Sequence, residues 1–233
     1  MINFYSQKHL SQAAVYALGT SFAVLASMAT VFFVAEPAIS YGQTDVFTIK
    51  QTITGESSFK VTAPDVTMAG SISGLTGGNA TGTTQFVVLT NSSAGYSVTI
   101  DFFNNAGAQA MLGDTSASQS IVDYVGSTMQ PEYDFTTTAS AQLAYTVTAS
   151  SSDDLDASFL DNGAACGSGG SGMNGRCWMA PSTTDFMIMD TTAAELAGAT
   201  STITFKVHVP NSASPALTAD TYTATATLTL ITK

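Results

Sequence analysis

The sequence predicts an all-β protein, an antiparallel β-sandwich of about seven to nine strands preceded by an N-terminal hydrophobic helix. Helical periodicity is scarce after residue 40, whereas residues 200–210 and 221–232 alternate apolar and polar side chains, as half-buried strands do. Ser and Thr supply roughly a quarter of the 233 residues, and Thr is enriched in strands. Hydrophobic residues make up 45% of the chain, enough for a packed core. A closed barrel is the alternative architecture.

Residues 1–40 are expected to be a signal peptide or a membrane anchor. Lys8 precedes an apolar stretch over residues 13–35, and Ala38 and Ser40 fit the small-x-small pattern of a signal cleavage site. The same stretch is long enough to cross a bilayer as a helix. Under both interpretations residues 41–233 form a single extracellular or cell-surface domain, which contacts a membrane only through the N-terminal segment.

The strands of that domain are expected in order along the chain. The alternation predicts strands at 44–54, 59–63, 142–150, 186–190, 200–210 and 221–232. Residues 85–91 and 96–103 predict a hairpin closed by residues 92–95. Residues 70–82 are typical of a Gly/Ser/Thr loop, and residues 120–125 fit a strand or a helical turn.

The charge balance excludes several classes of partner. Lys and Arg number 6 against 17 acidic residues, a net charge of −11. Nucleic acids and anionic membrane surfaces need clustered cations, so neither is an expected partner.

His208 is a candidate catalytic residue only by its type. It follows Lys206 on the predicted outer face of strand 200–210, with no Gly-x-Ser-x-Gly motif beside it. The chain is therefore not expected to be an enzyme, and an exported hydrolase that uses the carboxylates between Asp153 and Asp161 is kept as a third hypothesis.

Cys166 and Cys177 are the only cysteines, and they enclose the glycine-rich stretch CGSGGSGMNGRC. In an exported protein such a pair is expected to form a disulfide. The closed loop would gain about 3 kcal/mol of stability in the chain-entropy model.

Trp178 and Met179 directly follow the second cysteine. One interpretation makes them exposed contacts for a surface glycan or a host ligand. The other makes Trp178 a large apolar plug that packs on the disulfide, because Trp is highly buried on average.

Four carboxylates cluster in SSDDLDASFLDNG, and they are Asp153, Asp154, Asp156 and Asp161. Calcium takes six to eight oxygen ligands, so a calcium site is one hypothesis, although the spacing is not that of an EF-hand. The alternative is a capped helical turn that begins at Asp153 or Asp154, with Leu155, Phe159 and Leu160 facing inward. No other cofactor is expected.

The strand at 44–54 carries the hypothesis about assembly. Phe47, Ile49 and Ile53 share one face of it. Cleavage after Ser40 would place the strand almost at the free end of the chain. There it can pair within its own sheet, or it can insert into a neighbouring copy and build a homopolymer.

The chain resembles secreted bacterial immunoglobulin-like β-sandwich surface proteins of the pilin or fimbrial type. The shared features are the export segment, the terminal strand VFTIKQTIT, Thr-rich strands, one short disulfide and the final strand TYTATATLTL. The ending is similar to immunoglobulin-like modules that finish in Gly-Thr-Tyr-Thr-Ala-Thr, with Asp220 where the glycine would stand. This resemblance implies a structural subunit without catalytic residues. A surface-anchored adhesin or carbohydrate-binding module is the alternative function.

Overall fold

The computed structural model describes residues 46–103, 109–116, 118–126, 131–137, 139–168 and 174–233. Thr52–Lys233 forms one compact unit, and residues up to Gln51 belong to the unit before it. The predicted hydrophobic helix, the cleavage site and Asp45 all lie outside the described residues. No helix in the described part of the chain is long and apolar enough to span a bilayer.

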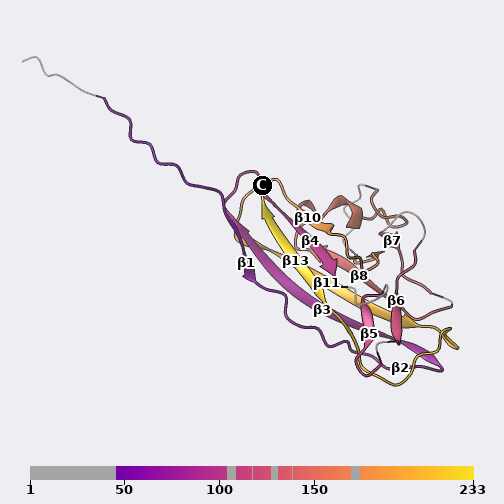
Figure 1. Ribbon diagram of the computed structural model, residues 1–233. Helices are drawn as coiled ribbons and strands as arrows, with labels where there is room; N and C mark the ends of the chain where they lie inside the picture. Colours follow the sequence, from indigo (N-terminus) through magenta and orange to yellow (C-terminus); the bar gives the residue numbers. More distant parts are fainter. Residues whose placement is uncertain (1–45, 104–108, 117, 127–130, 138, 169–173) are drawn as a thin grey trace, which may run out of the picture. The chain divides into compact units, whose positions relative to one another are not determined.

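The compact unit is all-β, as predicted (Figure 1). Its only helical elements among the described residues are the 3₁₀ turns η1 (Ser152–Asp154) and η2 (Ala157–Phe159). The eight-stranded sheet is mixed instead of purely antiparallel, because β6 (Ser120–Asp123) and β8 (Gln142–Ala149) pair in parallel.

The larger sheet is eight-stranded and curls through an order that does not follow the sequence. In spatial order its strands are β1 (Ser57–Val61), β3 (Gly77–Thr90), β11 (Glu195–Val209), β8 (Gln142–Ala149), β6 (Ser120–Asp123), β5 (Met111–Gly113) and β12 (Tyr222–Ala224), with β2 (Ile72–Ser73) beside β3. The smaller sheets are β10 (Phe186–Asp190), β4 (Tyr96–Phe102) and β13 (Ala226–Thr232), and β7 (Glu132–Tyr133) with β9 (Cys177–Trp178).

Strand β11 is the centre of the larger sheet. It pairs with β3 from Ala199 to Val209 on one edge and with β8 from Ser201 to His208 on the other. The alternation predicted for residues 200–210 is present, with Ile203, Val207 and Val209 buried on one face. The observed strand begins earlier, at Glu195, after a bulge that precedes Ala199.

The largest core cluster joins the larger sheet to the three-stranded one. Phe86, Val147 and Ile203 come from the first sheet, and Val98 and Ile188 come from the second; all five are essentially inaccessible to solvent. Burying a side chain of this size stabilises the fold by about 1.5–3 kcal/mol.

The other face of β8 and β11 is covered, which corrects the prediction of a solvated face. Tyr124, Phe135 and Ala144 form a separate buried cluster there, with Trp178 packed against it. His208 is consequently half-buried, with its ring edge-on to Phe135. Alternation alone could not show this cover, because the covering segments lie far away in the sequence.

Several predicted elements are confirmed, and three differ: the hairpin, the loop at 70–82 and the strand at 44–54, whose described residues 46–54 form no strand. Strands occur where alternation placed them at 142–150, 186–190, 200–210 and 221–232, and residues 120–123 form a strand. The hairpin 85–103 is wrong: Ser92–Gly95 is a turn, but β3 and β4 enter different sheets. The loop at 70–82 is wrong in part, because β3 already begins at Gly77.

The packing of β11 gives a direct test. Ile203→Ala should lower the free energy of unfolding by about 3 kcal/mol, since it leaves a cavity in the largest core cluster. Ile231→Ala, the same change on a side chain that is 52% exposed, should cost less than about 1 kcal/mol. Equal losses for the two variants in urea unfolding would contradict the described core.

Candidate functional site

The segment before β1 is extended and exposes its apolar side chains. Phe47 is 77% exposed, Ile49 83% and Ile53 81%. No residue from Val46 to Glu56 belongs to a strand, so the described part of the predicted strand 44–54 is not a strand in the structure. Residues 46–54 are called the extension below.

The C-terminal end of the extension is fixed by the side chain of Asn91. The Glu56 N–H donates to Asn91 Oδ1 at 2.7 Å, and Asn91 Nδ2 donates to the Thr54 carbonyl at 3.2 Å. The Glu56 carbonyl accepts from the backbone N–H of Asn91 and from Thr90 Oγ1. Sequence reasoning missed Asn91 as an anchor, because its partners lie more than thirty residues away and only the fold brings them together.

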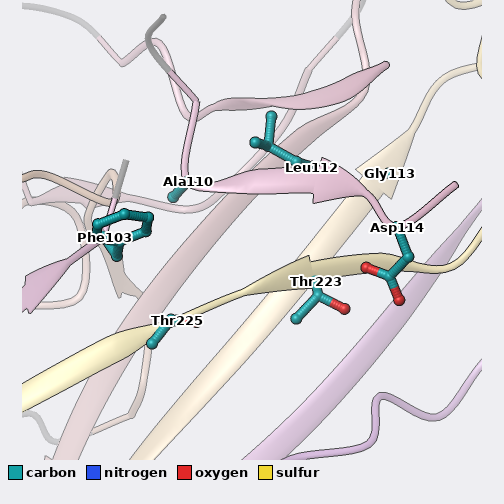
Figure 2. Close-up of a pocket in the computed structure, with 7 residues that line it drawn as sticks. All are labelled: Phe103, Ala110, Leu112, Gly113, Asp114, Thr223 and Thr225. Carbon is teal, nitrogen blue, oxygen red and sulfur yellow. The ribbon is translucent and has the colours of Figure 1, made fainter. Parts of the chain in front are cut away.

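A hollow of about 350 Å³ lies where β5 runs beside β12 (Figure 2). Its walls are apolar side chains and hydroxyls with one carboxylate, from Phe103, Ala110, Leu112, Gly113, Asp114, Thr223 and Thr225. Phe103 is 64% exposed. Among these lining residues there is no histidine, cysteine or cation, and the polar groups are the Asp114 carboxylate and the hydroxyls of Thr223 and Thr225.

The predicted disulfide is formed. Cys166 and Cys177 are joined with an S–S distance of 2.05 Å. Arg176, next to Cys177, donates through Nε to Asp134 Oδ1 at 2.8 Å and lies over the Tyr133 ring. Because Tyr133 and Cys177 are also paired in the β7–β9 ladder, the disulfide attaches the glycine-rich loop to a fixed position.

Trp178 and Met179 are half-buried. The Trp178 ring packs on Phe135, with centroids 5.7 Å apart, and Lys206 Nζ lies 5.6 Å from its centre. Met179 exchanges backbone hydrogen bonds with Tyr145. The plug interpretation had the wrong partner, because Trp178 covers the outer face of the larger sheet. Contact of these residues with a ligand stays a prediction.

The four aspartates have separate structural roles. Asp156 caps η2 through the Ser158 N–H, whereas the η1 cap is Ser151 instead of the predicted Asp153 or Asp154. Asp161 accepts from the Gly163 N–H. Leu155 and Phe159 are buried, as the helical-turn interpretation expected. Within the described residues, no three His, Cys, Asp or Glu side chains are grouped to hold a metal ion.

Two titratable groups are perturbed near these features. Burial, then Glu195 and Asp153, raise the pKa of the Asp154 carboxyl. Burial, then Lys206, lower the pKa of the His208 imidazole, whose Nδ1 has no hydrogen-bond partner. His208, on β11, lies against Phe135, whereas Asp154 lies in η1.

No family model, curated protein or solved structure matches this chain.

The loop closed by the Cys166–Cys177 disulfide gives one prediction. Replacing both cysteines, Cys166→Ala with Cys177→Ala, should lower the free energy of unfolding by about 3 kcal/mol, because the unfolded chain regains the entropy of an open loop. Chemical denaturation under non-reducing conditions measures the loss. A change below about 1 kcal/mol would show that the disulfide does not restrain the unfolded state.

The raised pKa of Asp154 gives a prediction with a defined sign. Above that pKa the folded protein holds a poorly solvated charge, and below the ordinary value of 3.8 the carboxyl is neutral in both states. Asp154→Asn should therefore raise Tm at pH 7.5, with the gain shrinking toward pH 4. The exposed control Asp185→Asn should not reproduce this trend. A gain of equal size at both pH values would contradict the electrostatic cause.

Proposed function

We propose that this chain is a non-enzymatic, extracellular structural subunit of a cell-surface filament or coat. Copies of the chain assemble into a homopolymer by exchanging the N-terminal strand 44–54. The compact unit serves as the body of each subunit, with its two principal sheets packed as an immunoglobulin-like sandwich. The hydrophobic residues 1–40 direct export, as a cleaved signal or as an anchor.

The single observation that carries the proposal is the exposed apolar face of the extension. Phe47, Ile49 and Ile53 alternate along an extended backbone, and each is more than three-quarters exposed. Burying such side chains yields about 1.5–3 kcal/mol each. A segment with an exposed apolar face is suited to strand addition on another chain.

Strand exchange of this kind has a defined symmetry. Each copy gives its extension to the next and receives one from the copy before it, so the contact is heterologous. Heterologous contacts that do not close into a ring extend without limit, and the product is a filament.

The composition supports a protein that contacts its own copies. Charged residues form only 10% of the chain. Charged residues are depleted from the centres of protein interfaces, and a Thr-rich surface permits close packing without burying charge.

The proposal is tested with two matched double variants of the extension. Phe47→Ser with Ile49→Ser removes the apolar face, whereas Thr48→Ser with Thr52→Ser changes the alternate face equally often and keeps Lys50. The first variant should stay monomeric, and the second should assemble like the parent. Sedimentation and negative-stain electron microscopy of the purified exported chain measure the difference.

Two results would contradict the proposal. The parent chain could stay monodisperse at every concentration reached, or the Phe47/Ile49 variant could form the same filaments as the parent. In the second case assembly would not depend on the extension. Unfolding curves of the variants in urea control for damage to the compact unit.

A further inference from the structure

We infer that the acceptor for the extension is the unpaired edge of the C-terminal strands β12 and β13 in a second copy of the chain. This inference rests on the proposed strand exchange and adds its recognition site. It is carried by the direction of the backbone groups along residues 221–233, by the state of the other sheet edges and by the apolar residues beside them.

Strands β12 and β13 are hydrogen bonded along one edge only. The Thr221 carbonyl accepts from the Asp114 N–H, and the Thr225 carbonyl accepts from the Phe103 N–H. Near the other end, the Lys233 N–H donates to the Gly95 carbonyl. All three residues are odd-numbered, so β4 and β5 lie along the same edge. Because backbone groups alternate in direction along a strand, the even-numbered residues point their N–H and C=O to the other edge.

That second edge has no strand partner among the described residues. β12 ends the order of the larger sheet, and β13 ends the order of the three-stranded sheet. β13 pairs with β4 over seven consecutive residues without a register shift, so its other edge is regular. β1 lies close to β13 but is not hydrogen bonded to it, so this edge has no ladder partner among the described strands.

The edges at β10 and β1, at the opposite ends of the two principal sheets, are less suited to accept a strand. The edge strand β10 has a bulge between Met187 and Met189. Its outer edge is partly occupied, since Leu155 forms a bridge with Met189 and the Asp156 N–H donates to the Ile188 carbonyl. β1 is also bulged, between Phe59 and Val61, and it is only five residues long.

The C-terminal edge lacks the features that normally prevent pairing between sheets. Residues 221–232 contain no charged residue and no proline. Natural edge strands are usually protected by charges, especially Lys, by Pro or by bulges. By contrast, β1 carries Lys60, and β10 ends in Asp190. A long, uncharged and regular edge is a template for another strand.

The apolar residues beside this edge match the extension. Leu228 and Leu230 point toward the core but are only half-buried, and so is Phe59 on β1; all three pack on the largest core cluster. An added strand would place alternate side chains next to them. Phe47, Ile49 and Ile53 are two or four residues apart, as side chains on one face of a strand must be. Their contact with Leu228, Leu230 and Phe59 would remove the apolar side chains of both copies from water.

Length and charge agree with this assignment. The nine residues of the extension are enough to cover the seven of β13. The extension contains one cation, Lys50, and no acid, whereas the whole chain has a net charge of −11. Two copies of an acidic chain repel least where a basic strand meets an uncharged one.

The end of the acceptor is held in place before any partner arrives. Ser92 Oγ donates to the Lys233 carbonyl at 2.7 Å. Lys233 Nζ pairs with Asp190 and donates to the Thr191 carbonyl at 2.8 Å. A fixed edge loses little conformational entropy when it binds, which favours association.

Cross-linking between mixed variants tests the acceptor, each variant carrying one introduced cysteine besides the disulfide-bonded Cys166 and Cys177. A full-length chain with Lys50→Cys is mixed with a tagged chain carrying Thr227→Cys on β13, Met187→Cys on β10 or Ser58→Cys on β1. All three acceptor positions are exposed. A short thiol cross-linker should join the Lys50→Cys chain to the Thr227→Cys chain, with at least tenfold less product for the other two.

A backbone substitution gives a second, independent test. Ala226→Pro removes an N–H that points to the open edge, so the subunit should fold, whereas the pyrrolidine ring should block strand addition. Ala226→Val keeps the N–H. The proline variant should raise the critical concentration for assembly by about tenfold or more relative to the valine variant.

The outcomes separate this inference from the proposed function. Filaments that cross-link through β10 or β1, or that form equally well with Ala226→Pro and Ala226→Val, would overturn the acceptor and leave strand exchange intact. A link that forms only within one chain carrying both Lys50→Cys and Thr227→Cys would show pairing in cis and overturn both. Absence of filaments and of every link between chains would also overturn both.

Discussion

The fold depends on hydrogen bonding along both edges of β11. Its backbone pairs with β3 and β8 along almost its full length, and its inward side chains complete the largest core cluster. Because a buried strand must satisfy every N–H and C=O, this position fixes the register of the strands on either side. The covering segments around Phe135 and Trp178 then close the outer face of β8 and β11.

The backbone N–H and C=O groups of β12 and β13 are hydrogen bonded only in part. β12 and β13 continue one strand direction from the larger sheet into the three-stranded one, paired along a single edge with β5 and β4. The extension, for its part, exposes the apolar side chains of Phe47, Ile49 and Ile53 to solvent. Strand exchange between copies would pair the second edge of β12 and β13 and would bury the apolar side chains of the extension. One contact would therefore explain both features and produce the proposed polymer.

Local pattern predicted the strands but not their partners. Alternation located β8, β10, β11 and β12–β13, and cysteine spacing located the disulfide, because each depends on neighbouring residues. The hairpin failed because a turn at Ser92–Gly95 fits a link between sheets equally well. The anchor Asn91 and the covered face around His208 depend on contacts distant in sequence, which periodicity cannot reveal.

Hydrogen–deuterium exchange of the full chain, read peptide by peptide below and above the concentration of assembly, tests the central claim most directly. Amides in residues 46–54 and 222–232 should gain protection together on assembly, while those of β11 stay protected throughout, since its edges are already paired. Assembly that leaves either segment unprotected, or that protects β10 instead, would contradict strand exchange at this edge.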